Sequence, residues 1–362
     1  MSTKLEATAT GGRAAQQVND DAASGITTAG AHASNGKPSR RRPTLPPSLG
    51  PRNIGAVYVW IALIIIFTIW QPDLFTTVRT AKSALNQYAI TGLASLSVVM
   101  PLAAGIFDLS IGSTVGFAGV FAGWSLNTLG LPVIPAIALT LLAGACIGLL
   151  NAFVIVRMRI DSFIGTLATG SVIAALTVWV SGDQILTGKL SGSFTHFAST
   201  SVGGIQLPVI YMLVAMLVLA YLLEQTVFGR HIYAAGYGPD VARLVGLRVD
   251  RLRTISLVWS GVIASFAGIA LASQLGSADP TAGPSYLIPA FSAAFVGASQ
   301  FRHGRFNSWG TVVAVLMIGT GSVGLLLAGT QQWMPEVFQG VVLIAAVGIT
   351  TMQRKTAATK GT

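Results

Sequence analysis

Long apolar runs separated by short polar breaks fill the sequence between residues 54 and 352. A helix that spans a bilayer needs about 20 mostly apolar residues. Only 9% of the residues are charged, whereas soluble domains carry about 25%. The run at 287–300 is short for a span, which favours a broken or tilted helix there. The sequence therefore predicts an all-α polytopic membrane protein with about ten transmembrane helices, at 54–70, 84–104, 110–127, 133–156, 162–180, 208–227, 254–275, 287–300, 308–327 and 333–352.

The basic residues are distributed unevenly among the breaks. With ten spans both termini lie on one side, and 19 of the 22 Lys and Arg residues share that side. Only Arg79, Lys82 and Lys189 fall on the other side. Because cytoplasmic segments carry an excess of Lys and Arg, both termini are predicted to be cytoplasmic. The same rule explains the net charge of +10 without a nucleic-acid partner.

The chain divides into three predicted segments. Residues 1–53 are polar and rich in Ala, Gly, Ser and Thr, which predicts a disordered cytoplasmic tail. Arg40, Arg41 and Arg42 precede prolines, and no cleavage site follows the first apolar run, which disfavours an export signal. Residues 54–352 form the predicted transmembrane domain, and residues 353–362 form a predicted cytoplasmic C-terminal tail.

The sequence lacks the common catalytic and metal-binding patterns. Cys146 is the single cysteine, which excludes a disulfide framework and a cysteine-based zinc site. The stretch 182–190 resembles a phosphate loop, but its glycine spacing is wrong and Leu190 replaces the Ser or Thr that holds magnesium. The histidines lie far apart in the sequence, at His32, His196, His231 and His303. We therefore expect no enzyme activity, metal or cofactor, and any ATP hydrolysis is expected from a separate subunit.

The stretch AGIFDLSIGSTVG places Asp108 between two apolar runs, at membrane depth. A carboxylate at the centre of a bilayer costs about 2.5–3.5 kcal/mol on insertion scales. Capping would offset that cost, because Asp108 or Ser110 can accept hydrogen bonds from the free N–H groups of a new helix. The stretch therefore predicts a broken helix with a capped restart.

Several stretches together resemble one transporter family. The stretch GIFDLSIGS (105–113) resembles a signature of the ribose/xylose/galactose-type ABC importer permeases, in the branched-chain amino acid/monosaccharide permease superfamily. The likeness runs from about residue 75 to residue 352 in the family's order. Further resembling segments are GLLNAFVIVRMRIDSFIGTLAT (148–169), FGRHIYAAGYGPDVARLVGLRVDR (228–251), ASQLGSADPTAG (272–283) and GRFNSWGT (304–311).

The resemblance implies the permease subunit of a bacterial inner-membrane importer, which moves a monosaccharide or sugar-like polyol by alternating access. It also implies the partners: ABC ATPase subunits, an extracytoplasmic sugar-binding protein and a second permease copy, all at the lipid bilayer. The alternative is a secondary transporter of a small neutral solute. Such a transporter should carry paired charges inside its spans, and the apolar runs contain almost none.

The broken segment is the candidate translocation pathway, represented by Gly105, Asp108, Ser110, Gly112 and Ser113. Residues 84–180 and 254–352 form two blocks of four spans that enter the membrane in opposite directions, and each has a glycine-rich interruption. Paired interruptions in inverted halves indicate a transport pathway. Polar side chains in the runs predict an uncharged path for a neutral polyol, for example at Asn86, Ser95 and Ser292.

The loop 228–253 is the longest internal cytoplasmic loop of the predicted topology. Its stretch GPDVARLVG predicts a short helix that begins at Pro239 and Asp240 and ends at Gly246. Asp240 and Arg243 lie three residues apart, so both side chains should share one face of that helix. The resemblance implies that the ATPase subunit contacts this helix. The candidate coupling residues are Gly238, Asp240, Ala242, Arg243 and Gly246.

Overall fold

The computed structural model describes the backbone of residues 55–190, 192–300 and 304–359, and the side chains in these ranges as far as residue 348 except that of Lys189. The chain divides into two units, Met1–Thr44 and Leu45–Thr362, and every described residue belongs to the second. The tail predicted for residues 1–53 lies outside the described residues.

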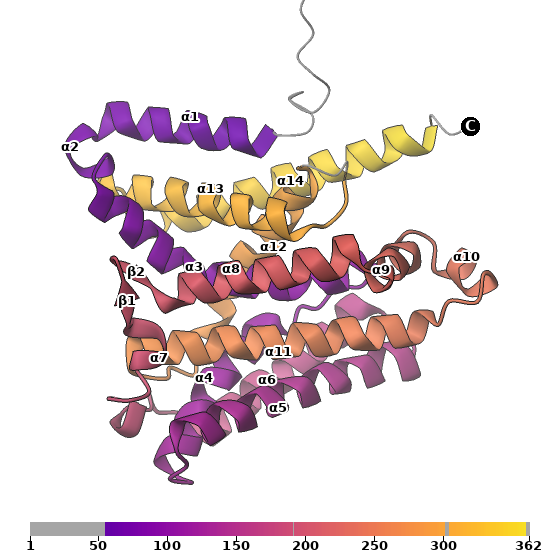
Figure 1. Cartoon of the computed structure of the whole chain (residues 1–362), viewed down its shortest axis with the longest axis horizontal. Helices are drawn as coiled ribbons and strands as arrows, with labels where there is room; N and C mark the ends of the chain where they lie inside the picture. Colours follow the sequence, from indigo (N-terminus) through magenta and orange to yellow (C-terminus); the bar gives the residue numbers. More distant parts are fainter. Residues whose placement is uncertain (1–54, 191, 301–303, 360–362) are drawn as a thin grey trace, which may run out of the picture. The chain divides into compact units, whose positions relative to one another are not determined.

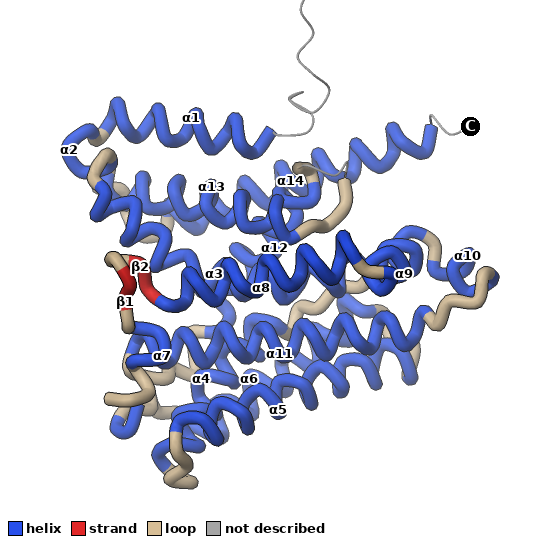
Figure 2. The backbone as a smooth tube through the Cα atoms, viewed as in Figure 1, coloured by secondary structure: helices blue, strands red, loops and turns tan. Residues whose placement is uncertain are grey.

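Helices account for most of the described chain, as Figure 2 shows. This architecture confirms the all-α prediction except for one small hairpin of two strands, β1 (Ser201–Val202) and β2 (Ile205–Gln206). The helices are α1 (Gly55–Trp70), α2 (Pro72–Phe75), α3 (Val78–Ala103), α4 (Ile111–Asn127), α5 (Val133–Ala152), α6 (Ser162–Ser181), α7 (His196–Ser199), α8 (Leu207–Ala220), α9 (Val227–Tyr237), α10 (Pro239–Leu244), α11 (Val249–Leu275), α12 (Leu287–Ala298), α13 (Ser308–Leu327) and α14 (Met334–Thr359).

Each of the ten predicted spans contains one of these helices. Within the described residues, five helical segments are long and apolar enough to cross a membrane: Val133–Arg157, Ser162–Ser181, Leu207–Gln225, Val249–Leu275 and Ser308–Leu327. The chain is thus a membrane-embedded protein, and the count of ten spans stays a prediction. The short run at 287–300 corresponds to α12, which has only 12 residues.

Several helices extend beyond the apolar runs that predicted them. α3 begins at Val78 rather than at residue 84, and α11 begins at Val249 rather than at residue 254. α14 continues to Thr359 and so enters the predicted C-terminal tail. Hydropathy locates the apolar part of a helix, whereas backbone hydrogen bonds carry the helix onward through charged residues such as Asp250.

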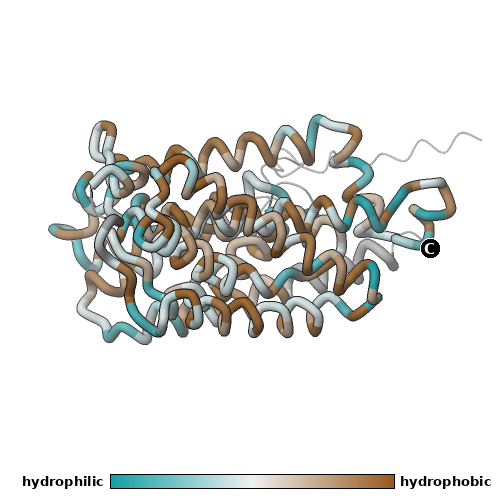
Figure 3. Tube along the Cα trace, turned by 90° about the horizontal axis from the view of Figure 1, so that it is seen from below, coloured by the Kyte–Doolittle hydropathy of each residue, from teal (hydrophilic) through white to brown (hydrophobic). Residues whose placement is uncertain are grey.

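The connecting segments lie at two opposite ends of the helices (Figure 1). α9, α10 and the end of α14 lie at one end, here called the α10 end. The β1–β2 hairpin, α2 and α7 lie at the other, here called the hairpin end. Hydrophobic residues predominate along the middle of the helices and hydrophilic residues gather near both ends (Figure 3). This distribution fits helices that cross a bilayer.

α3 and α11 lie at the centre of the helix packing, and α11 contacts α3, α4 and α5. Glycines allow the closest approaches: a Cβ atom on Gly148 would lie 2.4 Å from the carbonyl oxygen of Leu257. A Cβ atom on Gly268 would lie 2.1 Å from the carbonyl oxygen of Val115. Because lipid removes most of the hydrophobic drive between helices, such close packing is what holds them together. Glycines on α5 and α11 therefore bring these helices into close contact with their neighbours.

Large apolar side chains cover the outward faces of the peripheral helices. Ile134 on α5, Trp179 on α6 and Ile69 on α1 are all more than three-quarters exposed. Exposed apolar surface of this extent is rare on soluble monomers and indicates contact with a membrane or a protein partner. These faces are suited to lipid.

Candidate functional site

The predicted helix break lies between α3 and α4, at residues 104–110, and is here called the first break. Pro101 occupies the last turn of α3, and Gly105 follows with φ +76°. Positive φ is accessible to glycine at little energetic cost, so Gly105 allows the chain to leave the helix axis. The backbone N–H of Gly105 still donates to the carbonyl of Leu102 (3.2 Å), which satisfies one free end of α3.

Asp108 closes the first break and is only 1% exposed. Its Oδ1 accepts hydrogen bonds from the backbone N–H of Ser110 (3.2 Å) and from the Ser110 hydroxyl (2.6 Å). Asp108 therefore caps the turn that precedes α4, and both of these hydrogen bonds come from Ser110 rather than from the N–H groups of α4. Ser110 occupies the N-cap position of α4, but its side chain makes no capping hydrogen bond, so the predicted side-chain cap of the new helix is wrong.

Two residues of neighbouring helices complete a buried polar cluster with Asp108 and Ser110. Asn151 on α5 donates from Nδ2 to the Ser110 hydroxyl (2.7 Å) and, more weakly, to Asp108 (3.4 Å). Thr169 on α6 donates to Oδ1 of Asn151 (2.5 Å). Buried polar groups are stable only when hydrogen-bonded, so these four residues fix the first break against α5 and α6. Sequence reasoning did not identify Asn151 or Thr169.

α6 also supplies hydroxyl groups to the backbone of the first break. The N–H of Phe107 donates to the Ser162 hydroxyl (3.2 Å), and the N–H of Leu109 donates to the Thr166 hydroxyl (3.0 Å). Side chains four residues apart lie on one helix face, so α6 presents these acceptors in a row. Ser162, Thr166 and Thr169 recur at helical spacing in an apolar run, and this pattern in the sequence could have indicated a polar face on α6.

The second glycine-rich interruption, residues 276–286, packs against the start of α4. It ends in the 3₁₀ turn Gly283–Tyr286. A Cβ atom on Gly283 would lie 2.3 Å from the carbonyl oxygen of Gly112 and 2.7 Å from the nitrogen of Gly116. On the other side of α4, Ser113 lies beside Gly170 of α6. The structure thus packs the second interruption against the helix that follows the first break.

Aromatic rings lie where the first break meets α12. The ring centroids of Phe107, Phe291 and Phe295 form a triangle with all three separations equal to 6.4 Å. Phe306 packs edge-on against Phe295 at 5.3 Å. These rings form an apolar cluster beside the first break.

Two of the polar residues expected to face a solute, Ser95 and Ser292, use their hydroxyl groups in hydrogen bonds to helix carbonyls. Ser95 donates to the carbonyl of Thr91 (2.6 Å), and Ser292 donates to the carbonyl of Ile288 (2.7 Å). Both side chains are buried. Each hydroxyl satisfies a helix carbonyl, and a role for these two serines in a solute pathway stays a prediction. Asn86, the third, lies at the hairpin end and lines a cavity.

The predicted short helix is α10, Pro239–Leu244, with Pro239 at its first position and Gly238 as the residue before it. Gly246 has φ +85°, the left-handed conformation expected of it. Its N–H donates to the carbonyl of Arg243 (3.0 Å), and the N–H of Leu247 donates to the carbonyl of Ala242 (3.0 Å). This pair of bonds is the Schellman arrangement that terminates helices.

α10 has one charged side and one apolar side. Arg243 forms ion pairs with Asp240 (3.0 Å) and Asp250 (3.3 Å), so the predicted shared face of Asp240 and Arg243 is confirmed. Ala242 is buried beneath the helix. Three apolar side chains at the tip of α10 are strongly exposed: Val241 (66%), Leu244 (87%) and Val245 (72%).

α9, which the sequence reasoning did not predict, connects α10 to the first break. A Cβ atom on Gly236 would lie 2.1 Å from the carbonyl oxygen of Ala103, so α9 touches the end of α3 through its backbone. Tyr233 donates from its hydroxyl to the carbonyl of Phe306 (2.6 Å). Arg305 lies over the ring of Tyr233, 5.5 Å from its centroid. α9 therefore contacts both the first break and the segment that leads into α13.

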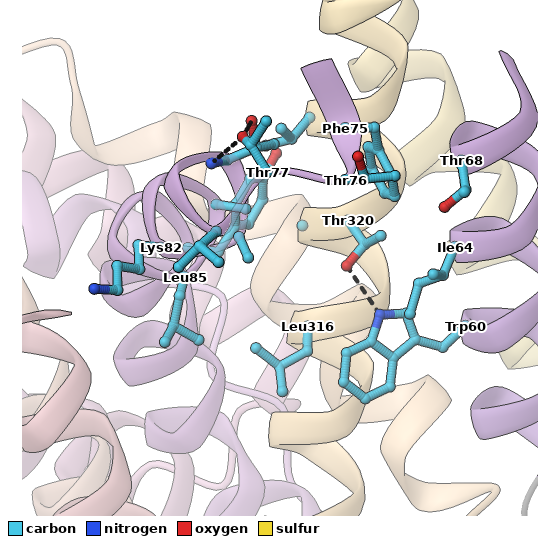
Figure 4. A pocket seen from close by; sticks show the side chains of 17 residues that line it. Trp60, Ile64, Thr68, Phe75, Thr76, Thr77, Lys82, Leu85, Leu316 and Thr320 are labelled. Carbon is cyan, nitrogen blue, oxygen red and sulfur yellow. Dashed lines mark hydrogen bonds between the residues drawn. The ribbon is translucent and has the colours of Figure 1, made fainter. Parts of the chain in front are cut away.

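A cavity of about 660 Å³ lies between α1, α2, α3 and α13 (Figure 4). Its lining is largely apolar, and several of its hydroxyl groups are already used. Thr80 donates to the carbonyl of Leu74 (2.7 Å), and Thr320 accepts a hydrogen bond from Nε1 of Trp60 (2.9 Å). Such a cavity offers few hydrogen bonds to a polyhydroxylated solute.

Comparison with known proteins identifies a family. The family model for "Branched-chain amino acid transport system / permease component" matches residues 80–347. The chain is 30% identical to a ribose import permease of Haemophilus influenzae, covering 79% of this chain and 89% of the relative. It is 33% identical to a ribose import permease of Bacillus subtilis, covering 79% and 88%. It is 31% identical to an autoinducer 2 import system permease of Photorhabdus laumondii, covering 82% and 92%.

Proposed function

The chain belongs to the permease family of branched-chain amino acid transport systems, and we propose that it is the transmembrane subunit of an ABC importer for a monosaccharide or sugar-like polyol. The observation that carries this proposal is the similarity to ribose import permeases over more than three-quarters of the chain. Within such an importer the chain is a transport subunit rather than an enzyme. ATP is hydrolysed by a partner.

α10 is the proposed contact for the ATPase subunit. Its exposed apolar tip would fill a groove on the partner, and the Arg243 ion pairs would hold the helix in one orientation. A partner shifts the permease between two states only if its contact differs in strength between them. The continuous packing from α10 through α9 to Ala103 supplies a physical route from this contact to the first break.

The proposed pathway passes the first break, at Gly105, Asp108 and Ser110, and the first turn of α4, at Gly112 and Ser113. The contact between the second interruption and the start of α4 supports this assignment, since the two segments belong to opposite halves of the chain. The cluster around Asp108 gives the chain a hydrogen-bonded, irregular backbone at membrane depth. Irregular backbone is tolerated there only where protein or a water-filled cavity surrounds it.

The remaining partners of the proposed importer are a second permease copy, an extracytoplasmic sugar-binding protein and the lipids of the bacterial inner membrane. Both termini are proposed to be cytoplasmic, which places α10 and the ATPase on the same side. The alternative, a secondary transporter of a small neutral solute, would need paired charges within its helices. The two described ion pairs both lie at α10 rather than within the helix core.

The orientation is tested by cysteine accessibility. In a Cys146→Ala background, Ser193→Cys should react with a membrane-impermeant maleimide from the outside, because it lies at the hairpin end. Thr356→Cys should react only after the membrane is permeabilised. Labelling of both cysteines from the same side would contradict ten spans with cytoplasmic termini.

The partner is tested by purification of the tagged permease from its native membrane. We expect the preparation to hydrolyse ATP, because the ATPase subunit remains bound. A matched preparation that carries apolar-to-polar changes at the α10 tip (Val241→Ser, Leu244→Ser) should lose that hydrolysis while the permease yield is unchanged. Hydrolysis that is absent from both preparations would contradict the proposed function.

A further inference from the structure

A second cavity, of about 670 Å³, lies at the hairpin end between α3 and α11, and it differs in chemistry from the apolar cavity of Figure 4. It is here called the basin. Amide groups from three elements line it, among them Asn86 and Gln87 on α3, Gln206 on the hairpin and Gln274 on α11. Amides both donate and accept hydrogen bonds, which is what a sugar hydroxyl requires.

Two glutamines form a pair across the basin. Nε2 of Gln274 donates to Oε1 of Gln206 (2.6 Å), which joins α11 to the hairpin. The pair leaves the Nε2 donors of Gln206 and the Oε1 acceptor of Gln274 available for a solute. If both side-chain amides are rotated by 180°, Gln206 donates and Gln274 accepts. The Nε2 donors of Gln274 and the Oε1 acceptor of Gln206 are then available instead. The pair therefore offers complementary groups to neighbouring hydroxyls in either arrangement.

The hairpin wall of the basin is fixed to α3 by hydrogen bonds. Oδ1 of Asn86 accepts the backbone N–H of Gln206 (2.9 Å), and its Nδ2 donates to the carbonyl of Gly204 (3.3 Å). Lys82 donates from Nζ to the carbonyl of Gly203 (2.5 Å). In Figure 4 the Lys82 side chain points away from the apolar cavity. These bonds hold Gln206 at a defined distance from Gln274.

The basin adjoins the second interruption. Tyr286 forms part of its lining and is the last residue of the 3₁₀ turn that begins at Gly283. Gly283 packs directly on Gly112, at the start of α4. Among the described residues, those that line the basin include Arg79 and Lys82 but no carboxylate, so a cationic solute would be repelled there. A neutral, hydroxyl-rich solute meets no such barrier.

We propose that the basin is the site where a neutral polyhydroxylated solute first binds the permease, held by the Gln206–Gln274 pair. The assignment rests on the proposed function, because that function makes the hairpin end the side from which solute arrives. Binding at the basin would place the solute beside the two helices that precede the interruptions, α3 and α11. The solute would then be positioned for entry when those helices move.

The test uses a cysteine reporter in the assembled transporter in native membrane vesicles. Gln87→Cys lines the basin outside the glutamine pair, and the background carries Cys146→Ala. The rate of labelling by an impermeant maleimide is measured with D-ribose, D-xylose, D-galactose or ribitol, and with L-leucine as a solute that lacks neighbouring hydroxyls. Thr128→Cys, at the end of α4 and outside the basin, serves as the control reporter.

We expect at least one of the polyhydroxylated solutes to slow labelling of Gln87→Cys by about threefold or more, with no effect on Thr128→Cys. Adding Gln274→Leu should remove that protection, because the leucine side chain keeps most of the volume and loses the amide. Protection by none of these solutes, or protection that persists with Gln274→Leu, would overturn the assignment.

ATP-dependent uptake of the same solutes separates this assignment from the proposed function. A solute that is taken up with ATP but never protects Gln87→Cys would show that the basin assignment is wrong while the proposed function stands. Protection without ATP-dependent uptake of any of the solutes would leave the basin as a binding site and overturn the proposed function.

Discussion

Replacing Gly236 with alanine is expected to destabilise the protein and to lower uptake at least tenfold. A glycine-to-alanine change inside a helix ordinarily stabilises by about 0.5–1 kcal/mol. At Gly236 the added methyl group would lie 2.1 Å from the carbonyl oxygen of Ala103, so the backbone of α9 or α3 must move. Overpacking of this kind costs about 1–3 kcal/mol, which reverses the usual sign.

The measurement is thermal unfolding of the purified permease, together with uptake in membrane vesicles. Gly340→Ala is the matched control, because a Cβ atom added to this helical glycine of α14 would meet no atom within 4 Å. The control should be as stable as the natural protein or slightly more stable. Equal stability and uptake for Gly236→Ala would show that the contact between α9 and the first break is not required.

Combining Arg243→Glu with Gly246→Val is expected to abolish most uptake while the permease stays folded and inserted. Valine at φ +85° is strongly disfavoured, so the end of α10 should unwind. Glutamate at position 243 would face Asp240 and Asp250 in place of their ion-pair partner. Exposed ion pairs contribute only about 0–1 kcal/mol to stability. The loss should therefore appear in coupling to the ATPase rather than in folding.

Uptake at least tenfold below the natural protein, at equal amounts of inserted permease, is the expected result. ATP hydrolysis by the partner can persist. Gly246→Asn provides a control, because asparagine tolerates the left-handed conformation better than other residues, and it should retain most uptake. If the double variant transports at the natural rate, α10 is not the coupling element.

The features that the sequence predicted correctly are those with local causes. The positions of the first break and of α10 follow from glycine, proline and capping residues that act on their immediate neighbours. Gly246 ends α10 by a pattern readable within a few residues. The apolar runs locate helices for the same reason, and five of the helical segments in the described residues meet the length requirement for a span.

The features that escaped prediction depend on segments distant in the chain. Asn151 lies 43 residues from Asp108, and Gln206 lies 68 residues from Gln274. Neither pairing follows from helix periodicity, because each depends on which helices are neighbours in space. α9 was missed because its mixed composition resembles a polar loop, and its close contact with α3 appears only in the folded structure.

The central claim is that this permease moves its solute at the expense of ATP hydrolysed by a partner bound at α10. Its most direct test is uptake of a radiolabelled pentose into proteoliposomes that contain the permease, its ATPase and its binding protein. The account predicts uptake only when ATP reaches the ATPase, with no uptake from an imposed proton or sodium gradient alone. Uptake that follows either ion gradient without ATP would contradict it and identify a secondary transporter.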